Sequence, residues 1–184
     1  GFGTHPHDNM EIITIPLEGA LAHKDNMGNG TIIKKGDIQV MSAGTGITHS
    51  EFNSNEDHAV KVLQIWLFPN KKNVTPRYDQ LSLQNIKVKN EFYQILSPNQ
   101  NDQGVWIYQN SWFSLAEFDY DKEVNYNLNL TSNGVYIFVI EGQIKVGKES
   151  LEKRDGFGIW NTENINISAL KGTKILLMEV PMSV

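Results

Sequence analysis

The segment IQVMSAGTGITHSEFN, residues 38–53, contains the pattern that decides the fold. Its first residues are apolar or β-branched, which favours a strand. The small residues SAGTG at 42–46 then predict a bend, because glycine adopts backbone angles that other residues resist. A second strand follows, and alternate residues of a strand share one face. We therefore expect the side chains of His49 and Glu51 to project together from a sheet.

A second pair of donors lies near the start of the chain, at His5-Pro6-His7. Two such pairs on different strands would offer four ligands to one ion. Imidazole nitrogens together with a carboxylate suit iron, nickel, copper or zinc. Thiolate ligands are excluded because the chain has no cysteine. The two pairs predict a transition-metal site built from nitrogen and oxygen donors.

Short strands separated by turn signals account for the rest of the first half. Short strands are predicted at 10–17, 20–25, 31–34, 38–41, 49–53 and 60–68, with glycine, asparagine or aspartate between most of them. Short strands resume after residue 92, and no segment shows a convincing helical periodicity. An all-β fold, either an antiparallel barrel or a sandwich, is the natural interpretation.

The composition limits the class of protein. A chain of 184 residues is long enough for one good core or two small ones. A net charge of −5 without a basic block argues against a nucleic-acid surface. No run approaches the roughly 20 apolar residues of a membrane span. The lack of cysteine fits a cytoplasmic location. Because the first donor pair lies so close to Gly1, we expect residues upstream to supply further strands.

Two glycine-containing motifs resemble those of cupins. The first comprises Gly3, His5, His7, Glu11 and Gly19, and the second comprises Gly36, Gly46, His49 and Asn53. The runs LEG at 17–19, MGNG at 27–30, MSAGTGI at 41–47 and TPRY at 75–78 extend the likeness. Together they make residues 1–80 resemble the pirin family of bicupins. This resemblance implies an all-β chain of two cupin (jelly-roll) barrels.

Spacing alone leaves the carboxylate ligand open between Glu11 and Glu51. Glu51 lies about 7 Å along the strand from His49, whereas Glu11 lies about 13 Å from His7 on a straight strand. A bulge between them would bring Glu11 closer, so it remains the reserve ligand. The resemblance to pirins implies the set of His5, His7, His49 and Glu51.

The second half of the chain reads as a copy of the first without the donors. LEGAL at 17–21 aligns with IEGQI at 140–144, and KKGD at 34–37 aligns with RDGF at 154–157. These offsets place Leu128, Leu130, Ala169 and Lys171 where the first half has its four donors. We expect a metal-binding barrel over residues 1–70, a connection over 71–91, and a barrel without metal ligands over 92–184. At most one ion would bind per chain.

Two further histidines are assigned no ligand role. His23 lies on a predicted strand and is expected to be exposed or hydrogen-bonded, outside the metal site. His58 follows several acidic or polar residues and is expected to be solvated in a loop.

The resemblance also implies an activity. Some pirins resemble quercetin 2,3-dioxygenases, which would make a flavonol-like aromatic and O2 the substrates. The implied cofactor is one divalent transition metal ion, with iron(II) first and nickel, copper, zinc or manganese as alternatives. Glu51, as ligand or nearby base, would accept the flavonol proton. The competing interpretation is a metal- or redox-sensing regulator that binds a protein partner; a third is a purely stabilising ion. We expect a monomer.

Overall fold

The computed structural model describes residues 1–183, and the chain divides into two compact units. Unit 1 contains residues 1–85 and 98–109, and unit 2 contains residues 86–97 and those from 110 onward. Residues 71–91, expected to be a connection, include a strand that pairs within unit 1, and residues 98–109 return to that unit. The chain therefore passes between the units more than once.

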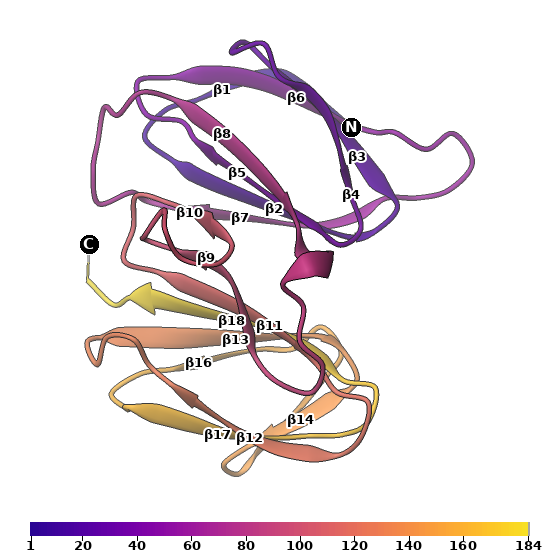
Figure 1. The fold of residues 1–184 in the computed structure, drawn as a ribbon, viewed down its shortest axis with the longest axis vertical. Helices are drawn as coiled ribbons and strands as arrows, with labels where there is room; N and C mark the ends of the chain where they lie inside the picture. The colour runs from indigo at the N-terminus through magenta and orange to yellow at the C-terminus, as the bar shows by residue number, and fades with distance from the viewer. Residues whose placement is uncertain (184) are drawn as a thin grey trace. The chain divides into compact units, whose positions relative to one another are not determined.

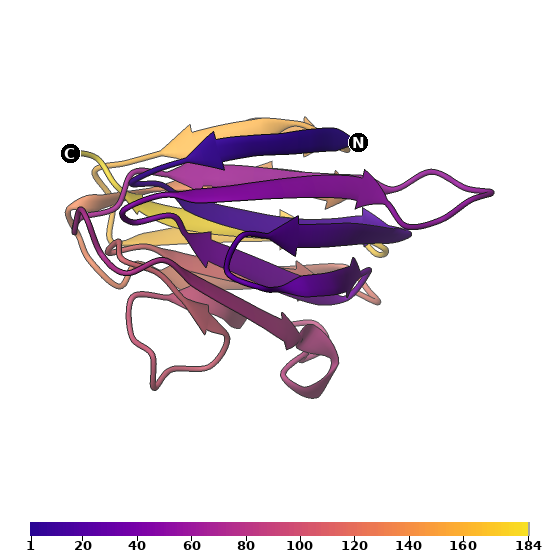
Figure 2. The same ribbon diagram turned by 90° about the horizontal axis from the view of Figure 1, so that it is seen from above.

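Unit 1 is built from two four-stranded antiparallel sheets, which Figure 1 shows facing each other. The first has the order β1-β6-β3-β4 and the second the order β7-β2-β5-β8. The strands are β1 (Phe2–His7), β2 (Glu11–Glu18), β3 (Ala20–Asp25), β4 (Gly30–Lys34), β5 (Asp37–Ser42), β6 (Ile47–Asn53), β7 (Lys61–Leu67) and β8 (Arg77–Ser82), with the short η1 helix (Leu83–Asn85) and β10 (Val105–Trp106) after them. In Figure 2 these strands run side by side along a common direction.

The glycine-rich bend predicted at 42–46 lies between β5 and β6. Gly44 and Gly46 have positive φ angles of 49° and 132°. The carbonyl of Gly44 accepts a hydrogen bond from the backbone of Asn9, which follows β1, at 2.9 Å. The bend thus fixes the start of β6 relative to the end of β1. Apolar side chains of the adjoining strands, Ile12, Met41 and Ile47, pack together as a small core beside it.

Unit 2 repeats the two-sheet arrangement. In one sheet β9 (Tyr93–Ser97), β11 (Trp112–Glu117), β18 (Lys174–Pro181), β13 (Asn133–Glu141) and β16 (Gly156–Ile159) follow one another. The other has the order β12 (Lys122–Asn127), β17 (Asn164–Ala169), β14 (Gln143–Val146), β15 (Glu149–Glu152). Their facing side chains form a large apolar core that includes Phe118, Ile137 and Ile167.

The ladder registers correct the alignment of the two halves. The backbone amides of Lys34 and Glu152 each donate a hydrogen bond to the carboxylate of the aspartate three residues later, so the second turn is equivalent at an offset of 118 and not 120. His5 pairs with His49 in β1–β6, as Tyr126 pairs with Ile165 in β12–β17. By the same comparison, the residues of unit 2 that are equivalent to His5, His7, His49 and Glu51 are Tyr126, Leu128, Ile165 and Ile167. At these positions, too, unit 2 has neither a histidine nor a carboxylate.

The all-β expectation is confirmed. Within residues 1–183 the helical content is limited to one short 3-10 helix. None of the described helices is long and apolar enough to cross a membrane.

Candidate metal centre

Strand β6 carries two of the predicted donors and lies between the strands that carry the others. On one side β1 places His5 opposite His49. On the other side β3 places His23 opposite Glu51 and Asp25 opposite His49. The period-two alternation of the strands turns these side chains to one face of the sheet. Donors that are far apart in sequence therefore meet around β6.

Three of the predicted ligands form one compact group. One ring nitrogen from each of His5, His7 and His49 lies within 4.8 Å of the other two. The ring centroids are 4.4 Å apart for His5 and His49, and 5.0 Å apart for His7 and His49. His49 is buried and the other two are partly exposed, so one edge of this group remains accessible.

The fourth predicted ligand belongs to a second group that shares His49. Donor atoms of His23, His49 and Glu51 lie within 4.8 Å of one another, and all three residues are buried. The carboxylate Oε2 of Glu51 accepts a hydrogen bond from Gln64 Nε2 at 2.8 Å, which orients it. The structure thus brings His5, His7 and His49 together and joins Glu51 to them through His49.

Sequence reasoning underrated His23. Its side chain is 0% exposed, and its Nε2 lies 3.3 Å from Asp25 Oδ2. It is hydrogen-bonded, as expected, but it is not exposed and it contributes to a donor group. The signal was present in the chain, because His23-Lys24-Asp25 has the same alternate spacing as the other two donor pairs. His58, by contrast, is exposed and bonds to Asp57 in its loop, in agreement with expectation.

Burial and mutual repulsion favour neutral imidazoles, the form that binds metals. Burial, followed by the charges of His5, His23 and His7, lowers the pKa of His49 to about 4. Burial and the charge of His5 also lower the pKa of His7. His5 Nδ1 lies 2.8 Å from the carbonyl of Gly3. Since a carbonyl accepts, Nδ1 carries the hydrogen and Nε2 is free to bind an ion.

Several buried polar atoms of the two groups lack a hydrogen-bond partner among residues 1–183. They are His7 Nε2, His23 Nδ1, both ring nitrogens of His49, and Glu51 Oε1. Buried polar groups normally have partners, because leaving one unpaired costs about 1–3 kcal/mol. A divalent ion would satisfy nitrogen and oxygen lone pairs that converge in this way. The donor set fits such an ion.

Glu11 lies in a different environment. It belongs to neither donor group within the described chain. Its Oε2 accepts a hydrogen bond from Ser42 Oγ at 2.7 Å. The same Ser42 Oγ accepts a hydrogen bond from Arg77 Nη1 at 3.2 Å. Arg77 stacks on Trp106 with its guanidinium 3.9 Å from the ring centroid. Glu11 is thus held in a polar cluster with Ser42 and Arg77.

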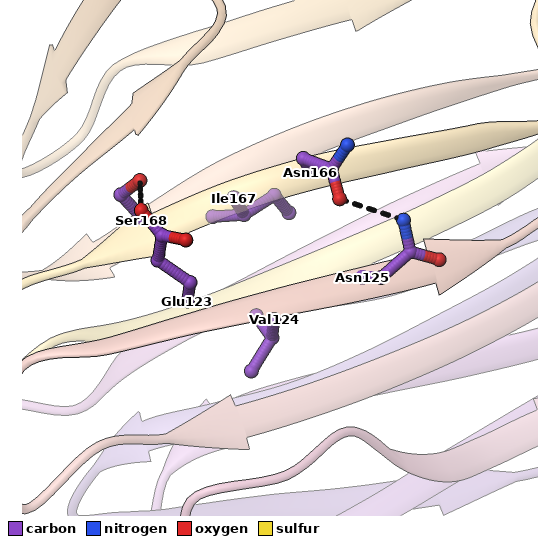
Figure 3. A pocket seen from close by; sticks show the side chains of 6 residues that line it. All are labelled: Glu123, Val124, Asn125, Asn166, Ile167 and Ser168. Atoms are coloured by element: carbon purple, nitrogen blue, oxygen red, sulfur yellow. Dashed lines mark hydrogen bonds between the residues drawn. The ribbon is translucent and has the colours of Figure 1, made fainter.

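A shallow depression in unit 2 offers much less chemistry. Figure 3 shows its lining, which comes from directly opposed residues of β12 and β17: Glu123, Val124, Asn125, Asn166, Ile167 and Ser168. Asn125 Nδ2 donates to Asn166 Oδ1 at 2.8 Å. Two of the lining residues, Val124 and Ile167, belong to the apolar packing of the unit. We assign no function to this depression.

Comparison with known proteins agrees with this arrangement. Residues 1–67 match the family model described as Pirin, and residues 94–180 match the one described as Quercetinase C-terminal cupin domain. The chain is 35% identical over 185 aligned positions to the quercetin 2,3-dioxygenase of Escherichia coli K12, covering 98% of this chain and 77% of that protein. The chain belongs to the pirin family. The two barrels are therefore cupin barrels, as expected.

Solved pirin structures share the fold. The crystal structure of YhhW from Escherichia coli superposes with a TM-score of 0.91 at 34% identity, covering 98% of this chain and 76% of that one. A nickel(II) complex of the same bacterial pirin gives a TM-score of 0.90 at 33% identity, with the same coverage. A pirin of closely similar fold thus binds a divalent transition metal.

Proposed function

We propose that this pirin is a metal-dependent oxidoreductase of the quercetin 2,3-dioxygenase type, which opens a flavonol ring with O2 and releases carbon monoxide. The observation that carries the proposal is the convergence of unpartnered imidazole and carboxylate atoms around β6. The name of the Escherichia coli relative supports the substrate class. The donor set supports the cofactor.

We propose His5, His7, His49 and Glu51 as ligands of one divalent ion per chain. Iron(II) remains our first expectation, and nickel(II) gains support from the nickel complex of the Escherichia coli pirin. A bound ion would supply Lewis acidity toward a phenolate oxygen and access to oxygen chemistry. Zinc, copper and manganese remain alternatives within the same donor chemistry.

Residues of the chain itself would bind the substrate and move its proton. Glu51, as ligand or nearby base, would accept the proton of the flavonol 3-hydroxyl; its Oε1 has no partner in the described chain, and its Oε2 is held by Gln64. Trp66 contacts the edge of the His7 ring, with centroids 4.9 Å apart, and is 52% exposed. Its indole offers an aromatic surface beside the accessible donors, where a flat substrate would stack.

The direct test uses the flavonol itself. Protein loaded anaerobically with iron(II) or nickel(II) is mixed with quercetin and then exposed to air. We expect loss of flavonol absorbance with release of carbon monoxide, which separates this reaction from simple autoxidation. His49→Ala should lower metal occupancy by about tenfold or more and abolish carbon monoxide release. Circular dichroism would check that the barrel remains folded.

Carbon monoxide at the level of the His49→Ala control would refute the dioxygenase proposal. In that case a regulator that binds a protein partner becomes the better interpretation, with the second barrel as the binding surface, and a pull-down with metal-loaded protein would test it. We further propose that the protein is cytoplasmic, supported by the absence of cysteine, and that it does not bind nucleic acid, supported by the acidic net charge of −5. We also propose that it is a monomer. Sedimentation would test the oligomeric state.

A further inference from the structure

We propose that His23 is an additional metal ligand, so that the barrel has a buried donor set of His23, His49 and Glu51 overlapping the more accessible set of His5, His7 and His49. This inference rests on the proposed metal centre. It adds a third strand, β3, to the two that carry the four proposed ligands.

The hydrogen bonds of Asp25 determine how the His23 ring presents its nitrogens. Asp25 Oδ1 accepts the backbone amides of Met27 and Asn29 at 2.9 and 3.0 Å, and Oδ2 accepts Asn29 Nδ2 at 2.7 Å. Both oxygens of Asp25 therefore act as acceptors, and the turn that follows β3 anchors them.

Because Asp25 Oδ2 is an acceptor, His23 Nε2 carries the hydrogen in their contact. In the neutral ring, Nδ1 is then an unprotonated lone pair. It is buried and has no hydrogen-bond partner among the described residues. A carboxylate that fixes the tautomer of a histidine and leaves the other nitrogen free is the usual support of a metal-bound imidazole.

The neighbours of His23 also have polar atoms without a partner. Glu51 Oε1 and both ring nitrogens of His49, one of which is an acceptor in the neutral ring, are buried and unpartnered in the described chain. The His23 and His49 rings lie 5.4 Å apart between centroids. Lone pairs and a carboxylate that gather away from water need a cation among them. This need arises within the buried set, independently of His5 and His7.

Packing holds the His23 ring in place. Tyr78 lies against it, with centroids 5.1 Å apart and an interplanar angle of 32°. The Tyr78 hydroxyl is itself fixed, because it donates to Gln80 Oε1 at 2.7 Å and lies 2.6 Å from Thr31 Oγ1. A ring held by Asp25 on one edge and Tyr78 on one face is pre-organised for binding.

Cobalt(II) provides a probe with readouts other than activity. Metal-free protein is titrated with cobalt(II), and binding is followed by the visible absorption of the cobalt complex. The titration is carried out on the wild type and on three variants: His23→Gln, the double variant His5→Gln/His7→Gln, and His58→Gln. We expect His23→Gln to weaken cobalt binding about tenfold or more and to change the spectrum. The double variant should still bind one equivalent, and adding His23→Gln to it should abolish binding. His58→Gln, in the exposed loop, is the matched control and should behave as the wild type.

Counting ligands in the wild type keeps the test independent of variant folding. Each coordinated histidine with a ring N–H gives one exchangeable, paramagnetically shifted proton resonance in the cobalt protein. Four such resonances would support His23 as a ligand, whereas three would overturn it. An unchanged titration for folded His23→Gln, or no binding by the folded double variant, would also overturn it. Failure of the wild type to bind cobalt at all would instead refute the proposed metal centre.

Discussion

Two buried glutamates in unit 1 have opposite surroundings. Each has one oxygen that accepts a side-chain hydrogen bond, from Gln64 in Glu51 and from Ser42 in Glu11, and one buried oxygen without a partner in the described chain. Glu51 lies among histidines, whereas Glu11 lies near the charge of Arg77. A carboxylate already supplied with a donor and a cation has less need of a metal. The local environment, and not the strand parity, separates their roles.

This contrast predicts the ranking of two conservative variants. Glu51→Gln removes a charged ligand and should weaken metal binding by about tenfold or more, whereas Glu11→Gln should leave it within about twofold of the wild type. Competition with a chromophoric chelator measures both affinities. The reverse ranking would transfer the carboxylate role to Glu11.

Glu11 should instead make stability depend on pH. Burial raises its pKa from the usual 4.5, although Ser42, Arg77 and the backbone of Tyr108 act the other way. The folded chain then holds the proton more tightly than the unfolded chain. The contribution of protonated Glu11 to the stability of the folded chain is fully present below pH 4.5. It is lost as the pH rises through the pKa of Glu11 in the folded chain.

Glu11→Gln should remove this loss of stability, because glutamine does not titrate. We expect the free energy of unfolding of the variant minus that of the wild type to increase from about pH 4 to about pH 7 in urea titrations. Glu18→Gln is a control of opposite sign, because the hydrogen bond from Lys61 lowers the pKa of the exposed Glu18. Parallel profiles for wild type and Glu11→Gln would contradict the prediction.

At the scale of elements, the site depends on how β6 begins. The bend before it brings Gly44 close to the backbone carbonyl of Val74, where a Cβ on Gly44 would lie 2.0 Å from that oxygen. Thr45 also donates its amide to the same carbonyl at 3.0 Å. The bend and the segment before β8 are thus in direct contact, and this contact fixes the strand that carries His49 and Glu51.

Gly44→Ala should therefore destabilise the protein by about 2 kcal/mol or more, because both the positive φ angle and the contact with Val74 oppose a side chain. Gly28→Ala is the matched control. Gly28 also has a positive φ, of 97°, but has open space around its Cβ position, so only the backbone strain of about 1 kcal/mol remains. Equal losses of stability in chemical unfolding would show that the contact with Val74 is unimportant.

At the scale of the whole molecule, the two units use the same architecture for different interiors. The unit 2 positions equivalent to the donors include Tyr126, Ile165 and Ile167, which belong to its apolar core. The buried carboxylate of unit 2, Glu179, is fully engaged: it accepts the Tyr126 hydroxyl at 2.9 Å and further donors from Asn129, Leu130 and Asn133. Both oxygens of Glu179 accept hydrogen bonds, whereas Glu51 Oε1 has no partner in the described chain, so Glu179 needs no metal ion to satisfy it.

Unit 2 should accordingly bind no transition metal. We expect elemental analysis of purified, metal-loaded protein to give about one ion per chain, consistent with one site in unit 1. Glu179→Ala should destabilise the protein by about 3 kcal/mol or more, because it leaves several buried donors unpaired, without changing that ratio. A second tightly bound equivalent would contradict this division of roles.

The residues alone were enough to predict the strands, the glycine bend and the shared face of each donor pair. These features are local, since side-chain alternation and the freedom of glycine depend on a few consecutive residues. The neighbours of each face depend on pairing between strands distant in the chain. Only the folded structure shows that β3 brings His23 opposite Glu51, that Glu11 lies beside Arg77, and that the repeat is offset by 118 residues at the second turn. Registers of this kind are set by the packing of whole sheets, which no short stretch of sequence encodes.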